Sequence, residues 1–111
     1  MSYGVFFSIE ALGRKVGASS PEYCSGTDTA MELLASLSSE GDFFGLIDED
    51  GTCLQVRFED SKNSYWFEVP RPDLSGSYGA YYSYDAAAKA VENLPGIFPE
   101  AGLDGFKFSS W

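Results

Sequence analysis

The chain of 111 residues has no histidine, two cysteines, and only seven lysine or arginine residues against seventeen acidic ones. Without histidine it lacks the commonest general base, the commonest zinc ligand and the nucleophile pairs that depend on an imidazole. Cys24 and Cys53 fit no close-spaced metal or redox motif, so we expect buried free thiols, although the sequence leaves a disulfide between them open. These absences predict a protein that is not an enzyme and has no cofactor or metal.

The shortage of basic residues leaves a formal net charge of -10. This charge repels nucleic-acid phosphates and anionic lipid heads, which proteins bind through clusters of Lys and Arg. We therefore expect no direct binding to nucleic acid or membrane, and self-repulsion favours a monomer. No apolar run has the length of a membrane span, and residues 1–9 lack the basic start of an export signal, so a cytoplasmic location is expected.

The apolar content of the chain is sufficient for a folded core. Hydrophobic residues make up 44% of the sequence and aromatic residues 16%, well above the content of a disordered acidic tail. The length accommodates one core, and a single domain over residues 1–111 is expected.

Periodicity and capping residues indicate two helices, over residues 30–39 and 84–94. Thr29 and Glu32 have the spacing of a capping box, and Gly41 fits the end of the first helix. Ser83 is placed to cap the second helix. The residues expected to face inward are Met31, Leu34 and Leu37, and then Ala87, Ala88, Val91 and Leu94.

Three runs rich in β-forming residues, between residues 43 and 70, predict an antiparallel meander. A two-residue turn at 50–51 would place Ile47 opposite Leu54, and a four-residue loop at 60–63 would continue the same buried face. The pairs expected across that loop are Phe58 with Tyr65, Val56 with Phe67 and Leu54 with Val69.

The remaining segments complete the expected sheet. Strands are predicted near both ends, over residues 3–9 and 106–111. Residues 13–26 and 71–79 are typical of loops by composition, and an edge strand at residues 80–82 is an alternative at the end of the second one. The predicted fold class is therefore α+β, an antiparallel sheet built on the meander and packed against two helices.

The expected register gives the meander a second, mixed face. It would carry Phe44, Leu46, Gln55, Arg57, Glu59, Trp66 and Glu68. One interpretation is that the N-terminal strand or a helix covers its apolar residues. The other is that Trp66 is an aromatic anchor ringed by charge, a composition found at binding hot spots.

Charged and aromatic residues together predict an interaction surface. Residues 28–60 hold nine acidic residues and one basic residue, which suits electrostatically steered association with a basic protein. Tyrosines beside a Ser/Gly-rich loop are also typical of binding surfaces. The residues predicted to contact the partner are Asp48, Glu49, Asp50, Glu59, Asp60, Trp66, Glu68, Tyr78, Tyr81 and Tyr82.

The layout of residues 27–111 resembles the immunity proteins of bacterial polymorphic toxin systems, most nearly the family called immunity protein one. The features that carry the resemblance are the capped amphipathic helix, the meander that begins at Phe43, the aromatic strand around Trp66, the late Ala-rich helix and the terminal Trp111. The resemblance implies a small α+β domain that binds one cognate toxin and blocks its active site or substrate access. The spacer before Trp111 is longer than in the family, and the family's toxin-contacting residues vary between members, so none is assigned by position.

Two other functions fit the size and acidity of the chain. An acidic secretion chaperone would dimerise and present an apolar groove to an effector segment. A nucleic-acid mimic would carry acids spaced like phosphates along one face and inhibit a DNA-binding enzyme. Size-exclusion chromatography separates the chaperone from the other two, and a toxin gene directly upstream would favour the immunity protein.

Overall fold

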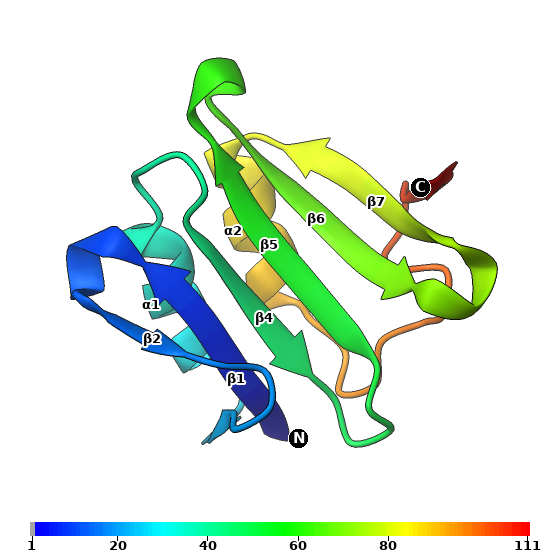
Figure 1. Ribbon diagram of the computed structural model, residues 1–111, viewed down its shortest axis with the longest axis horizontal. Helices are drawn as coiled ribbons and strands as arrows, with labels where there is room; N and C mark the ends of the chain where they lie inside the picture. Colours follow the sequence, from blue (N-terminus) through cyan, green and yellow to red (C-terminus); the bar gives the residue numbers. More distant parts are fainter. Residues whose placement is uncertain (1) are drawn as a thin grey trace.

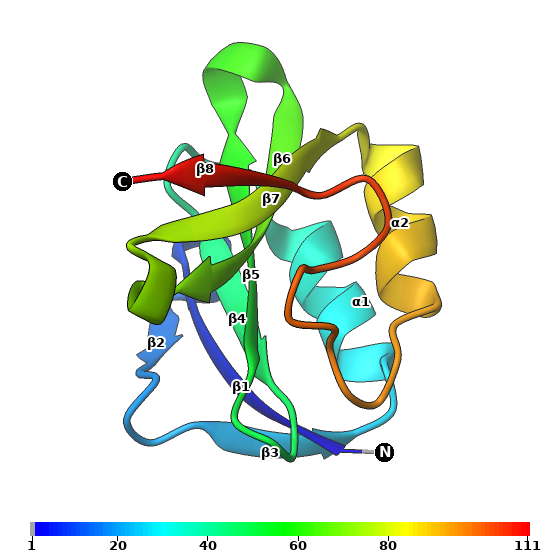
Figure 2. The same ribbon diagram turned by 90° about the vertical axis from the view of Figure 1, so that its right-hand side faces the viewer.

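The computed structural model describes residues 2–111 and has an α+β fold, which confirms the predicted class (Figure 1). Within this range, eight antiparallel strands form one sheet and two α-helices pack on one side of it (Figure 2). The strands are β1 (Ser2–Ile9), β2 (Arg14–Val16), β3 (Glu22–Ser25), β4 (Phe43–Ile47), β5 (Cys53–Glu59), β6 (Ser64–Arg71), β7 (Gly76–Tyr82) and β8 (Lys107–Ser110), and the helices are α1 (Asp28–Ser36) and α2 (Tyr84–Glu92). The expected domain starts at residue 1, which lies outside the described residues.

The predicted terminal strands are confirmed as β1 and β8, and β1 lies inside the sheet. On one side β1 pairs with β4, and on the other its residues 2–5 pair with β3 and its residues 7–9 with β2. The order across the sheet is β2-β1-β4-β5-β6-β7-β8. The last strand, β8, therefore forms one edge of the sheet, and the first strand, β1, lies near the opposite edge (Figure 1).

The register of the meander is partly as predicted. The pairing across the β5–β6 loop is confirmed, with Phe58 opposite Tyr65. The β4–β5 pairing is shifted by one residue, because Leu46 rather than Ile47 lies opposite Leu54. A one-residue shift moves every side chain of a strand to the other face. The prediction that Phe44 and Leu46 belong to the mixed face is therefore wrong.

The shift arises from a turn that is one residue longer than predicted. Asp48 N–H donates to Thr52 C=O at 3.0 Å, so residues 49–51 form the turn. Phe44 and Leu46 consequently point toward the helices and are fully buried. All five residues of β4 are apolar or glycine, and its sequence therefore carries no alternation that could have revealed the register.

Two segments with loop-like composition contain strands. β2 and β3 lie within residues 13–26 and are mostly exposed at the edge of the sheet. β7 begins at Gly76, so the loop expected at 71–79 ends earlier than predicted. β7 also lies between β6 and β8, so it is not the edge strand expected at 80–82. Polar edge strands and glycine-containing strands lack the apolar alternation by which strands are recognised.

The first helix differs from its prediction at both ends. Thr27 is its N-cap residue and forms no side-chain cap bond, whereas Thr29 lies inside the helix. The predicted capping box is therefore wrong. Gly41 does not end the helix, because Leu37 already adopts an extended conformation at the C-cap.

The second helix is closer to its prediction. Ser83 Oγ accepts a hydrogen bond from Ala86 N–H at 3.3 Å, which confirms the cap. Ala87 and Val91 are fully buried, and Leu94 is buried just beyond the helix. Together with α1, this helix closes one core against the sheet. The largest fully buried side chains of that core are Tyr3, Phe44, Phe67, Ile9, Leu34, Leu46, Leu54, Val5, Val56, Val69 and Val91.

A buried carboxylate closes the β4–β5 turn. Asp48 Oδ1 accepts hydrogen bonds from the N–H groups of Asp50 and Thr52, both at 2.9 Å, and Oδ2 accepts from Phe98 N–H at 2.8 Å. Asp48 is only 5% exposed. Gly51 completes the turn at φ +84°, which glycine adopts at little cost. Asp48 therefore joins this turn to the segment that follows α2.

We expect Asp48→Ala to lower the free energy of unfolding by about 3 kcal/mol, because three backbone N–H groups lose a charged acceptor. Glu49→Ala is the matched control, since Glu49 is exposed in the same turn and its loss should cost less than about 0.5 kcal/mol. Urea unfolding followed by tryptophan fluorescence measures both variants. Equal stabilities would contradict the role assigned to Asp48.

A second buried carboxylate, Asp42, holds the loop between α1 and β4. Its Oδ1 accepts from Glu10 N–H at 3.1 Å, and its Oδ2 accepts from the N–H groups of Ser38 and Ser39, both at 3.0 Å. Burial acts to raise the pKa of Asp42, but these hydrogen bonds outweigh burial and lower the pKa below its ordinary value of 3.8. The folded protein therefore favours the charged form.

A carboxyl whose pKa is lower in the folded state stabilises the fold fully above its unfolded pKa, and this stability is lost as the pH falls through the folded pKa. We expect Asp42→Asn to cost about 2 kcal/mol at neutral pH, because an amide cannot accept from donors on both sides. The difference from the parent should shrink as the pH falls below 3.8. Urea unfolding at several pH values tests this, with exposed Asp60→Asn as the control. A difference independent of pH would refute it.

Candidate functional site

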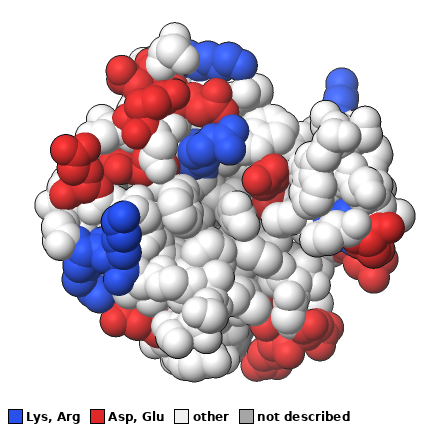
Figure 3. All heavy atoms as spheres, in the orientation of Figure 1, with Lys and Arg blue, Asp and Glu red and all other residues white. Residues whose placement is uncertain are grey.

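One side of the sheet carries no helix of residues 2–111 (Figure 2). We call it the open face and define it by the strand residues on the side away from the helices, of which Phe6 and Ser77 are themselves buried. The defining residues are Phe6 and Ser8 of β1, Phe43, Gly45 and Ile47 of β4, Cys53, Gln55, Arg57 and Glu59 of β5, Ser64, Trp66, Glu68 and Pro70 of β6, Ser77, Gly79 and Tyr81 of β7, and Lys107 of β8. Figure 3 views this side, and its middle is largely uncharged, with acidic residues gathered near the margins. A partly aromatic face with few charged residues is typical of an interaction surface.

Two aromatic rings lie flat on the open face because glycine is beneath them. A Cβ atom at Gly79 would overlap the indole ring of Trp66, and a Cβ atom at Gly45 would overlap the ring of Phe6. Phe6 in turn packs against Phe43, with ring centroids 6.4 Å apart. The glycines therefore let large rings cover the backbone of the sheet.

Trp66 and Tyr81 form the aromatic centre of the open face. They face each other across β6 and β7, with ring centroids 4.7 Å apart and planes tilted by 53°. Tyr81 is 46% exposed, and Trp66 is half-buried. Aromatic pairs in such offset geometry gain energy beyond their buried area. This pair has the composition of a binding hot spot.

A chain of polar contacts fixes Tyr81. Its hydroxyl donates to Glu59 Oε1 at 3.3 Å and accepts from Lys62 Nζ at 3.0 Å, and the same ammonium lies 4.3 Å from the centroid of the ring. Glu59 also forms a salt bridge with Arg57 at 3.0 Å. Burial acts to raise the pKa of Glu59, but hydrogen bonds from Arg57 and Tyr81 and the charges of Arg57 and Lys62 lower it overall. Glu59 is therefore already paired within the chain.

The residues predicted to contact a partner are distributed over several places. Trp66, Glu68, Glu59 and Tyr81 share the open face, but Asp48 is buried and cannot serve at the surface. The other predicted residues lie at turns or on the helix side, which is the side of the sheet covered by α1 and α2 (Figure 2). Glu49 and Asp50 are in the β4–β5 turn, Asp60 follows the opposite end of β5, and Tyr78 and Tyr82 alternate with the open face.

The acidic segment of the sequence does not form one acidic patch. β5 has seven residues, so the acidic turns at its two ends lie roughly 20 Å apart. The helices and the segment after them carry six acids and one base, namely Asp28, Glu32, Asp85, Glu92, Glu100, Asp104 and Lys89. The helix side therefore contributes more net negative charge than the open face.

Phe6, Phe43 and Ile47 belong to the open face although the sequence did not indicate them. Their assignment depends on the β4 register, which the continuous apolar run of β4 does not reveal. Lys62 was also missed. It lies outside the strands, in the 3-10 turn at residues 60–62, and its side chain reaches Tyr81 from the β5–β6 loop.

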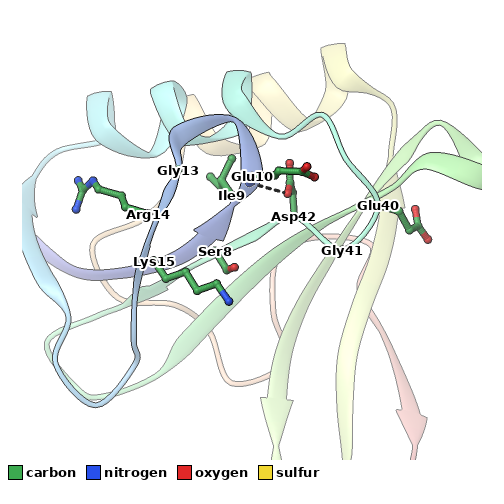
Figure 4. Close-up of a pocket in the computed structure, with 9 residues that line it drawn as sticks. All are labelled: Ser8, Ile9, Glu10, Gly13, Arg14, Lys15, Glu40, Gly41 and Asp42. Carbon is green, nitrogen blue, oxygen red and sulfur yellow. Dashed lines mark hydrogen bonds between the residues drawn. The ribbon is translucent and has the colours of Figure 1, made fainter.

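A hollow of about 430 Å³ lies beside the open face, between the β1–β2 connection and the loop before β4 (Figure 4). Its charged side chains do not converge. Arg14 forms a salt bridge with Glu22 at 3.2 Å, Glu40 accepts a hydrogen bond from Asp60 N–H, and the carboxylate of Asp42 is occupied by backbone donors. Catalytic groups need mutual geometry around one reacting atom, and this hollow does not provide it.

The two cysteines are free and lie on opposite sides of the sheet. Cys24 pairs with Tyr3 and packs against the core, whereas Cys53 belongs to the open face. Burial raises the pKa of the Cys53 thiol to about 11, with a further contribution from the charge of Glu68 and an opposing hydrogen bond from Gln55. Cys53 is therefore protonated at neutral pH, and the disulfide that the sequence left open is not formed.

Residues 2–111 contain no cluster of three or more metal-ligating side chains and no helix long and apolar enough to cross a membrane. Comparisons with protein-family models, with curated proteins and with solved structures each found no match to this chain. The residues of the open face are therefore the basis for assigning a function.

We expect Gly79→Ala to displace the indole of Trp66 and to lower the free energy of unfolding by about 1–3 kcal/mol, because the added methyl would also meet the Phe67 carbonyl oxygen at 2.7 Å. Gly17→Ala is the control, since only Ser19 lies near that position, at 3.9 Å. Tryptophan fluorescence and urea unfolding measure the effects. Unchanged fluorescence in Gly79→Ala would show that the indole does not rest on Gly79.

Proposed function

We propose that this chain is a protein-binding domain that neutralises a basic bacterial toxin, in the manner of an immunity protein, by covering the toxin's active site or the path to it. The observation that carries this proposal is the open face, on which the rings of Trp66 and Tyr81 are in contact and are not covered by any helix of residues 2–111. The proposed domain acts by binding alone.

The dimensions of the open face favour a protein as the partner. The face lies perpendicular to the shortest axis of the molecule, whose extents are 34 × 31 × 24 Å (Figure 3). This area accommodates the roughly 800 Å² per partner that a stable protein interface buries. A second protein surface can cover Trp66 and Tyr81 together, since both are at least partly exposed.

The charge of the chain favours a basic partner. The net charge of -10 creates a negative field around the whole molecule, and the helix side strengthens it. Such a field accelerates encounter with a basic protein, even where the contacting residues are of mixed charge. Enzymes that act on nucleic acids carry basic clefts for their own substrates, and a toxin of this kind fits the proposal.

The proposal is tested by neutralisation. If a toxin gene adjoins the gene for this chain, co-expression of the two should restore the growth of cells that the toxin alone kills, and the two purified proteins should form a complex of one copy each. A stable dimer of the free chain that binds an extended effector segment would favour the secretion chaperone instead. Failure to bind the toxin or to restore growth would overturn the proposal.

We expect Tyr81→Ala to weaken toxin binding by about thirtyfold, which corresponds to about 2 kcal/mol at an aromatic hot spot. Tyr84→Ala is the matched control, because Tyr84 is 44% exposed, close to the 46% of Tyr81, but begins α2 on the other side of the sheet. Calorimetric titration measures the affinities, and urea unfolding confirms that both variants fold. Similar losses in the two variants would exclude the open face as the interface.

A further inference from the structure

The two glutamates of the open face differ in their surroundings. Glu59 is paired with Arg57 and receives the Tyr81 hydroxyl. Glu68 is half-buried, and among the described residues no salt bridge or side-chain hydrogen bond engages its carboxylate. A half-buried carboxylate without a cation is placed to receive one from outside.

Glu68 also lies beside the aromatic centre. Its direct neighbour on β7 is Gly79, the residue on which the indole of Trp66 rests. Trp66 is two residues before Glu68 on the same face of β6, and the ring of Tyr81 contacts the indole at a tilt of 53°. The carboxylate and the indole therefore border the same small area of the sheet surface.

We propose that Glu68 and Trp66 form a receptor for an arginine side chain of the partner protein. The guanidinium would lie over the indole and donate hydrogen bonds to the Glu68 carboxylate, while Tyr81 supports the indole from the side. Arginine suits this place better than lysine, because its planar group both stacks on an aromatic ring and binds a carboxylate through two N–H groups. Lys107 and Arg57 are the cations nearest along the strands, and neither forms a salt bridge with Glu68.

This inference rests on the proposed function, because it names the chemistry by which the open face recognises a basic protein. It can nevertheless be tested without the toxin. Trp66 and Trp111 are the two tryptophans of the chain, so Trp111→Phe leaves Trp66 as the only indole reporter. Tri-arginine, tri-lysine and the uncharged tri-citrulline are titrated against this protein while its fluorescence is recorded.

We expect tri-arginine to change Trp66 fluorescence and to bind more tightly than tri-lysine, with no response to tri-citrulline. Adding Glu68→Gln should weaken tri-arginine binding about fivefold, the upper range for a partly exposed ion pair. Adding Glu49→Gln removes the same charge at an exposed turn and should leave the affinity within about twofold, because a distant surface charge is screened by salt. Both variants should unfold at the same urea concentration as their parent.

Several results would overturn the receptor. They are an absent fluorescence response, an equal response to tri-citrulline, equal binding of tri-lysine, or equal effects of Glu68→Gln and Glu49→Gln. The outcome is separable from that of the proposed function. If Tyr81→Ala weakens toxin binding but tri-arginine does not bind, the open face is still supported as the interface and the arginine receptor is refuted. If tri-arginine binds as expected but Tyr81→Ala does not change the affinity for the toxin, the receptor lies on a face that the toxin does not contact.

Discussion

The carboxylate of Asp48 binds three backbone N–H groups from two distant parts of the chain. Two of these donors set the length of the β4–β5 turn, and the third holds the segment that returns from α2. Because side chains alternate along a strand, the length of this turn decides which residues of β4 face the helices. Phe98, the third donor, also stacks on Tyr3 with ring centroids 5.4 Å apart. A single buried charge thus fixes both the division of the sheet into two faces and the closure of the core.

The parts of the fold that sequence predicted are those in which apolar and polar residues alternate. β5 and β6 alternate clearly, so their register and the placement of Trp66 opposite Arg57 were predictable. β4 is apolar throughout, and only the three-residue turn, set by side-chain hydrogen bonds, defines its register. The strands of residues 14–16 and 22–25 owe their conformation to pairing with β1 rather than to their own composition.

The candidate site shows the same division. Trp66 and Glu68 could be assigned to one face from local pattern, because β5 and β6 alternate clearly. Tyr81 could not be separated from Tyr78 and Tyr82, because no register was predicted for residues 76–82. The acidic residues of the turns could not be assigned in this way, since closeness in sequence does not become closeness in space when a strand separates two turns. Asp48 shows a further difficulty: a carboxylate in a turn has the same sequence signature whether it faces solvent or binds backbone donors. Only the fold distinguishes a steering charge from a structural one.

The open face is organised before any partner arrives. Gly79 supports the indole of Trp66, Tyr81 supports it from the side, and Glu59 and Lys62 hold the Tyr81 hydroxyl. A side chain that is already restricted has little rotational freedom left to lose, and ordering flexible side chains is one of the main costs of association. Most of the contact energy of these rings would therefore remain available as affinity. An exposed surface of few residues can in this way form a complex that dissociates slowly, without a deep groove.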